Sequence, residues 1–159
     1  MTIDVVNEAI LPASPDRVWT ELIAELNGGA RWWVPHNTYR TEESTGFEPG
    51  TVTHVTVHTR GVGRRGPKLE FVARVSEVNP DRELRSDYIG GVFRGGAVFR
   101  LIPLADGYKT KLVMHFRAEP QGFAKVLNRL ADMGAKHREA TQSAFQNLEK
   151  LLNLSGASS

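Results

Sequence analysis

The sequence of 159 residues contains no cysteine, and this absence excludes several kinds of chemistry. Without thiols the chain can form no disulfide, and it offers neither a thiolate nucleophile nor a thiolate metal site. No stretch approaches the roughly 18 apolar residues that a membrane-spanning helix requires. The first residues, Met1 to Asp4, lack the basic region and apolar run of a secretory signal. We therefore expect a cytoplasmic protein without a membrane span.

Strong net charge is also lacking, because 20 Lys and Arg residues face 18 Asp and Glu residues and leave a formal charge of +2. Binding of nucleic acid through its phosphates requires a clustered basic face, so we expect no nucleic-acid partner. The composition, with 40% hydrophobic and 24% charged residues, suits a single globular domain with a real core. We expect this domain to span residues 1–154 and to end in a disordered tail over residues 155–159.

The segment from Gln121 to Leu152 contains no proline and only two glycines, Gly122 and Gly134. Its apolar residues recur at spacings of three and four, which places them on one face of an amphipathic helix. These residues are Phe123, Val126, Leu127, Leu130, Met133, Phe145, Leu148, Leu151 and Leu152. At 1.5 Å per residue the helix would be on the order of 45 Å long, and it needs a broad apolar surface to lie on.

The middle of this apolar stripe differs from its ends, because it carries the small or polar residues Gly134, His137, Thr141 and Ala144. One interpretation is a helix that crosses a crowded spot with a hydrogen-bonded histidine. The other is that this segment roofs a cavity into which His137 and Thr141 point. The sequence leaves both interpretations open.

Upstream of this helix, alternating patterns predict strands. The first strand is expected over Ile3–Leu11. Ser14 and Pro15 then start a short helix, and Ala30–Val34 predicts a second short helical turn. Six further strands joined by turns are expected over residues 36–43, 51–60, 68–78, 84–88, 93–101 and 110–117. The charges of the last four strands fall mostly on one face, so we predict an α+β fold in which the long helix covers the apolar face of a seven-stranded antiparallel sheet.

Four short motifs carry a family resemblance: Ala13–Trp19, Trp32–Pro35, Glu77–Arg82 and Gly107–Leu112. Together with the element order, they resemble the helix-grip fold of the START-related, Bet v 1-like superfamily, also called SRPBCC. The likeness covers essentially the whole chain and is greatest to the bacterial polyketide cyclase/dehydrase and lipid-transport branch. It implies a curved sheet wrapped around the C-terminal helix, with a cavity for an apolar or aromatic small molecule between them.

Some members of that superfamily can be set aside. The Cys-x-His and Cys-x-x-His pairs that hold a Rieske cluster are absent, so the chain does not resemble the oxygenase domains. The last strand lacks the tryptophan-led motif of the co-chaperone relatives, and no second domain copy is present. His54 and His58 share a strand face but lie roughly 13 Å apart, which is too far for one metal ion to bridge. We expect neither a metal nor a cofactor.

The strand alternation and the helix stripe together predict a set of ligand-binding residues. They are Trp33, Tyr39, Phe71, Ala73, Ser86, Tyr88, Phe99, Met114, Leu130, Met133, Gly134, His137 and Thr141. We expect Trp33 near the cavity mouth. The same mostly apolar set would also be expected of an interior filled with side chains, and this alternative stays open.

Two of these residues are catalytic candidates. Histidine titrates near neutrality, so His137 could act as an acid or base, and Tyr88 could donate a hydrogen bond to a developing enolate oxygen. No carboxylate is expected on the inward face to orient His137, so a chance placement of a lone histidine is an equal alternative. The basic loop Gly61–Pro67 is either a solvated hairpin or a rim that steers an acidic ligand to the mouth.

Three hypotheses on function follow. The first is a monomeric or homodimeric carrier or sensor that binds a hydrophobic small molecule. The second is an enzyme of the polyketide cyclase, aromatase or dehydrase type that uses His137 and Tyr88. The third is an interaction protein with a filled interior.

Overall fold

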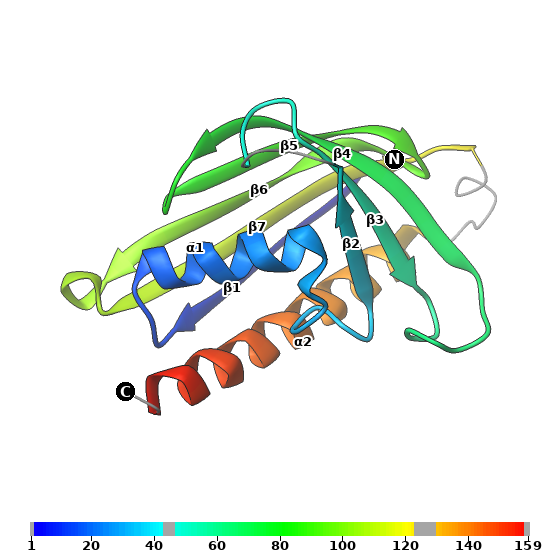
Figure 1. Ribbon diagram of the computed structural model, residues 1–159. Coiled ribbons are helices and arrows are strands. Elements are labelled where there is room, and N and C mark those ends of the chain that lie inside the picture. Colours follow the sequence, from blue (N-terminus) through cyan, green and yellow to red (C-terminus); the bar gives the residue numbers. More distant parts are fainter. Residues whose placement is uncertain (1, 43–46, 123–129, 158–159) are drawn as a thin grey trace.

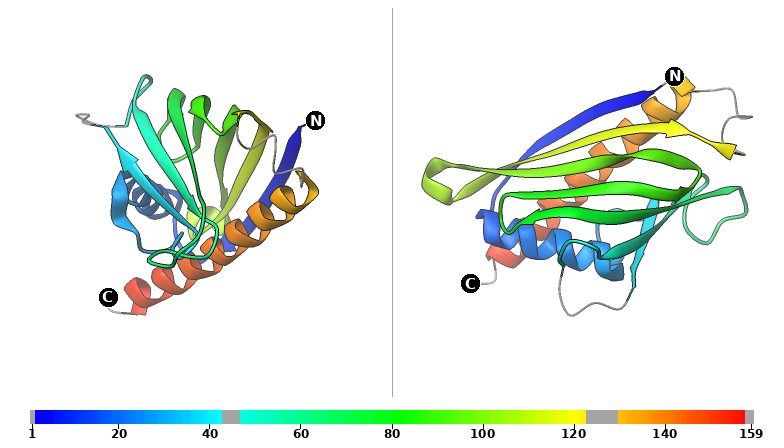
Figure 2. Two further views of the ribbon diagram at one scale, coloured as in Figure 1. Left: turned by 90° about the vertical axis from the view of Figure 1, so that its right-hand side faces the viewer. Right: turned by 90° about the horizontal axis from the view of Figure 1, so that it is seen from above.

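The computed structural model describes residues 2–42, 47–122 and 130–157 of the chain. In this part of the chain, seven strands form one curved antiparallel sheet, and a long helix, α2, lies across its concave side (Figure 1). A second helix, α1, covers one end of the same side (Figures 1 and 2). The α+β class, the single seven-stranded sheet and the long C-terminal helix are as predicted.

The strands follow one another as neighbours except for the first, in the order β1-β7-β6-β5-β4-β3-β2. Strand β1 spans Ile3–Leu11 and pairs with β7, so the first and the last strand of the sequence are neighbours in the sheet. The other strands are β2 (Asn37–Thr41), β3 (Val52–His58), β4 (Lys68–Asn79), β5 (Glu83–Gly91), β6 (Phe93–Leu104) and β7 (Lys109–Pro120).

Side chains alternate between the two faces of the sheet as the sequence pattern predicts. In β7, for example, Leu112, Met114 and Phe116 are buried, whereas Arg117 is exposed. The pairing of β4 with β5 shifts register twice, which indicates bulges, and bulges increase the local twist and bend of a sheet. At Gly95 of β6, φ is +134° and a Cβ atom would lie 2.2 Å from the main-chain oxygen of Arg117, so only glycine fits.

Helix α1 (Pro15–Ala24) continues directly into a π-helical turn, η1 (Glu25–Gly29). The second short helical element therefore lies upstream of Ala30–Val34, where the sequence pattern placed it. Residues 30–34 form bends because Ala30 adopts a left-handed conformation, with φ of 50°. The backbone N–H groups of the next residues then bond to a side chain instead of to helical carbonyl groups.

That side chain is Glu25, whose carboxylate is buried at 1% exposure. It accepts hydrogen bonds from the backbone N–H groups of Arg31 (2.9 Å), Trp32 (3.2 Å) and Trp33 (2.7 Å). These bonds satisfy the buried N–H groups of Trp32 and Trp33, which have no helical carbonyl as acceptor. Glu25 therefore fixes the loop that leads from η1 to β2.

Helix α2 is described from Leu130 to Ala157, a length of 28 residues or about 42 Å. Residues 123–129 of the helix predicted over Gln121–Leu152 lie outside the described residues, and α2 continues into the predicted tail. Its C-terminal half buries Ala144, Phe145, Leu148 and Leu152. Within the described part of the chain, no helix is both long and apolar enough to span a membrane.

A polar contact ties α2 to the edge strand β1. Asn7 is buried at 5% exposure, and its Nδ2 atom donates to the main-chain oxygen of Arg138 at 3.1 Å and to Gln142 Oε1 at 3.4 Å. Nearby, a Cβ atom at Gly134 would meet Ile3 and Val5 of the same strand. The N-terminal half of α2 thus follows β1 along the side of the sheet (Figure 2).

We predict that Glu25→Ala lowers the free energy of unfolding by at least about 3 kcal/mol, because it leaves the buried N–H groups of Trp32 and Trp33 and the partly buried one of Arg31 without their acceptor. Urea denaturation measures this change. Glu21→Ala is the matched control, since Glu21 makes a partly exposed ion pair with Arg31 at 3.4 Å, and its loss should cost less than about 1 kcal/mol. Equal losses in the two variants would contradict the role given to Glu25.

Candidate functional site

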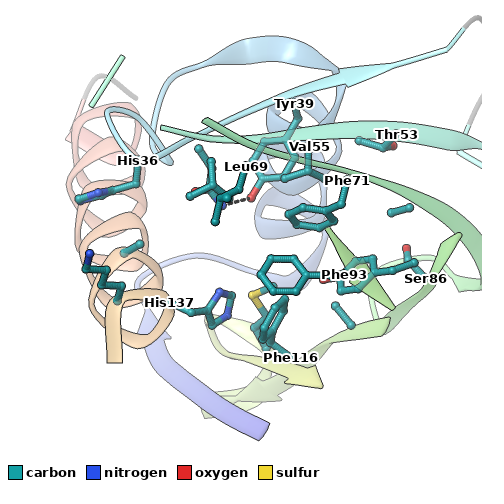
Figure 3. A pocket seen from close by; sticks show the side chains of 18 of the residues that line it. His36, Tyr39, Thr53, Val55, Leu69, Phe71, Ser86, Phe93, Phe116 and His137 are labelled. Carbon is teal, nitrogen blue, oxygen red and sulfur yellow. Dashed lines mark hydrogen bonds between the residues drawn. The ribbon is translucent and has the colours of Figure 1, made fainter. Parts of the chain in front are cut away.

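A cavity of about 310 Å³ lies between the concave face of the sheet and the N-terminal half of α2 (Figure 3). Its walls are mainly aromatic and aliphatic, and the aromatic members are Tyr39, Phe47, Phe71, Tyr88, Phe93, Phe99 and Phe116. Several of the rings pack edge to face, with centroids 5.1 Å apart for Phe71 and Phe93 and 5.7 Å apart for Phe93 and Phe116. Such contacts hold the wall in a defined shape.

The cavity opens to solvent where its lining residues are exposed. These are Thr59, just after β3, and Lys136 and Glu139 on α2. His36 and His58 line the same region (Figure 3 shows His36 facing α2). We call this opening, made by His36, His58, Thr59, Lys136 and Glu139, the cavity mouth.

Two tyrosines supply hydroxyl groups to the interior. The Tyr39 hydroxyl accepts a hydrogen bond from Asn37 Nδ2 at 3.2 Å, whereas the Tyr88 hydroxyl makes no hydrogen bond to any described residue. Burial raises the pKa of both phenols above the usual value of 10.0. Both hydroxyls therefore stay protonated at neutral pH, and that of Tyr88 can donate to a ligand.

His137 projects from α2 into the cavity and stacks on Phe116, with ring centroids 3.9 Å apart and an angle of 21° between the planes (Figure 3). Its Nε2 atom lies 3.3 Å from the hydroxyl of the buried Thr141. Burial lowers the pKa of His137 to about 4, so the imidazole is neutral at physiological pH. A neutral ring with so low a pKa is a weak base.

The two catalytic candidates do not contact each other through a hydrogen bond. Instead the ring of Phe116 packs against both, at 3.9 Å from His137 and 5.8 Å from Tyr88 between centroids. The hydrogen-bond partner of His137 is the hydroxyl of Thr141 and not a carboxylate. The geometry therefore suits the recognition of a ligand better than proton transfer between these two side chains.

Most of the predicted ligand-binding residues line the cavity: Tyr39, Phe71, Ala73, Ser86, Tyr88, Phe99, Met114, Met133 and His137. Gly134 faces β1, and Thr141 is buried behind His137. The prediction for Leu130 falls on a side chain outside the described residues.

Trp33 does not lie at the mouth, where the sequence analysis placed it. It is fully buried at 0% exposure, behind the cavity wall. Its ring packs against Trp32, Tyr39, Phe99 and Phe145, with centroids 4.9 to 6.2 Å apart. The reason is the anchoring of its backbone by Glu25, which turns the indole toward the core.

Several lining residues were absent from the predicted set. The largest group comes from β2, β3 and the segments beside them: His36, Asn37, Thr53, Val55, Val57, His58 and Thr59. On these strands both faces mix polar and apolar residues, so alternation does not identify the inner one. The run of Val55 and Val57 opposite Phe71 and Leu69 in the neighbouring strand was the available signal. Among the described residues, no three His, Asp or Glu side chains gather closely enough to hold a metal ion.

Comparisons with known proteins agree with this geometry. A family model described as "Polyketide cyclase / dehydrase and lipid transport" matches residues 2–153. A START superfamily protein from Mycobacterium smegmatis is structurally similar, with a TM-score of 0.67 at 15% identity over 94% of this chain and 98% of the other. Protein TTHA0849 from Thermus thermophilus gives a TM-score of 0.66 at 19% identity, over 96% and 98% of the two chains. At these identities the structural likeness supports the fold alone. No curated protein matches the sequence significantly.

Burial of the neutral His137 ring predicts a pH-dependent loss of stability. The pKa is about 4 in the folded protein and 6.5 ordinarily, so between these values the unfolded chain binds a proton that the folded protein does not. The free energy of unfolding, relative to that of His137→Gln, should therefore fall as the pH falls from about 6.5 to about 4. Urea denaturation of both proteins across this range tests the expectation, which a difference independent of pH would contradict.

Proposed function

Since the chain belongs to the polyketide cyclase/dehydrase and lipid-transport family, we propose that it binds an apolar or aromatic small molecule between the sheet and α2, as a carrier or sensor. The observation that carries this proposal is the cavity of about 310 Å³, which aromatic side chains line and which opens to solvent. Its volume lies near the lower end of the range for small-molecule sites. A ligand of one or two fused rings would fit this scale.

The few polar groups inside the cavity support recognition of a hydrogen-bond acceptor. The Tyr88 hydroxyl has no partner among the described residues, and Ser86 lines the same cavity. A ligand carbonyl or ether oxygen at this position would accept a hydrogen bond from the Tyr88 hydroxyl. The aromatic walls would supply most of the affinity through apolar burial.

A polyketide cyclase, aromatase or dehydrase activity is the second candidate, favoured by the family and by the free hydroxyl of Tyr88. Binding without turnover is preferred because the low pKa of His137 makes it a poor base and because no carboxylate of the described residues bonds to its ring. The third hypothesis, an interaction protein, required a filled interior, and the interior contains an open cavity. We further propose that the protein acts in the cytoplasm as a monomer or homodimer and does not bind nucleic acid.

We predict that Ala140→Trp weakens binding of the neutral dye N-phenyl-1-naphthylamine by about ten-fold or more, because the indole occupies the cavity that Ala140 lines. Fluorescence titration measures the affinity. Ala135→Trp is the matched control, since Ala135 is exposed on the same helix and does not line the cavity. If the dye fails to bind the wild-type protein, or binds the two variants equally, the proposed site is wrong.

The two candidate functions differ in what His137 and Tyr88 should do. For a carrier or sensor, Tyr88→Phe and His137→Gln should alter ligand affinity, and the wild-type protein should not accelerate cyclisation of a poly-β-ketone. For an enzyme, each substitution should reduce turnover by about 100-fold or more, as is typical of a lost acid, base or oxyanion donor. Product analysis by mass spectrometry separates these outcomes, with Tyr108→Phe, on the exposed Tyr108, as control.

A further inference from the structure

The basic loop between β3 and β4 lies beside the cavity mouth. The backbone N–H of Val62 donates to the main-chain oxygen of Pro35 at 3.0 Å, and His58 N–H donates to the oxygen of His36 at 2.8 Å. These bonds hold the loop against the segment that carries His36 into the cavity. The loop is therefore part of the surroundings of the mouth and is not an isolated hairpin.

Cations gather around this opening without carboxylate partners. Arg60, Arg64, Arg65 and Lys68 are exposed on or beside the loop, and Lys136 is exposed at the mouth on α2. None of the five forms an ion pair within the described part of the chain. Glu139 is the one carboxylate among the described lining residues. Lys136 and Glu139 balance within the mouth, so the excess of positive charge around it comes from the four cations on and beside the loop.

The outer face of the sheet provides a contrast. There Arg94 pairs with Glu119 at 2.7 Å, Arg100 with Glu83 at 2.9 Å and Lys111 with Glu8 at 3.4 Å. Several basic side chains of the outer face are thus paired, although Arg74 and Arg117 of that face form no ion pair with a described residue. Near the mouth, none of the five cations is paired within the described part of the chain. Unmatched charge beside an apolar cavity attracts a ligand of opposite sign.

His58 also lines the cavity, but it adds no charge there. Its Nε2 atom lies 2.8 Å from the Thr38 hydroxyl, while its Nδ1 atom is buried without a hydrogen-bond partner. Burial, with the nearby charge of Lys68, lowers the pKa of His58, so the ring is mainly neutral at pH 7. Because Nδ1 is enclosed by protein, a ligand in the cavity does not reach it. The lysine and arginine side chains at and beside the mouth are therefore the groups that can pair with an anion.

We propose that the ligand is an apolar molecule with a single carboxylate, and that this carboxylate lies at the mouth against Lys136. The ring system of the ligand would extend inward along the aromatic wall that includes Phe93 and Phe116. This inference rests on the proposed binding function and adds the charge and orientation of the ligand. Glu139 disfavours a second negative charge, and the basic loop raises the local concentration of the anion.

Matched naphthalene probes test the inference. Calorimetric titration at low salt should show 2-naphthoate binding about ten-fold more tightly than its neutral analogue 2-naphthamide. Lys136→Gln should weaken naphthoate binding by about five-fold and leave naphthamide binding unchanged, because it removes one partly exposed charge contact. The control is Lys150→Gln, because Lys150 is an exposed residue in the C-terminal half of the same helix and does not line the cavity. This substitution should change neither affinity.

The outcomes separate this inference from the function on which it rests. Equal binding of naphthoate and naphthamide by the wild-type protein, or equal weakening of both by Lys136→Gln, would overturn the carboxylate assignment. If N-phenyl-1-naphthylamine still bound, the cavity would remain a small-molecule site. If none of the three compounds bound, the proposed function itself would be wrong. A preference for naphthoate that shrinks as salt rises would support the assignment.

Discussion

The helix α2 is much narrower than the apolar face of the seven-stranded sheet that it covers. The rest of the structure depends on this difference in width. Strands spaced about 4.8 Å apart make such a sheet roughly 30 Å wide, whereas a helix with its side chains is about 10 Å across. Curling brings the sheet closer to the helix but does not bring every strand into contact with it. Phe145, Leu148 and Leu152 fill the space beneath the C-terminal half of α2, and α1 covers one end. The space that remains is the cavity.

The boundary between filled core and cavity is set by the loop after η1. Glu25 holds the backbone of Trp32 and Trp33, and the Trp33 ring then packs between Phe99 and Phe145. The chain leaves this anchored segment directly into His36 and Asn37, which line the cavity. One buried carboxylate thus supports both the end wall of the cavity and part of its mouth.

Most of the fold could be predicted from the pattern of hydrophobic residues in the sequence. The alternation in β4 to β7 identified the inner residues Phe71, Ala73, Phe99 and Met114. In these strands one face is apolar and the other is in contact with solvent, so apolar and polar residues alternate clearly along the sequence. The position of Trp33 could not be predicted in this way, since it depends on hydrogen bonds to a glutamate eight residues earlier. The contribution of β3 was missed because the polar Thr53 faces inward there beside Val55, so polarity does not mark the outer face of this strand. The stack of His137 on Phe116 depends on how two distant segments meet, which local patterns do not encode.

The side-chain amide of Asn7 decides which residues α2 presents to the cavity. Its bonds to Arg138 and Gln142 lock the helix axially against β1. A slip by one turn, about 5.4 Å, would put Met133 or Thr141 where His137 now stacks and would carry Lys136 away from the mouth. Strand β1 contributes little to the cavity wall, yet through Asn7 it fixes the axial position of α2, the helix that covers the cavity.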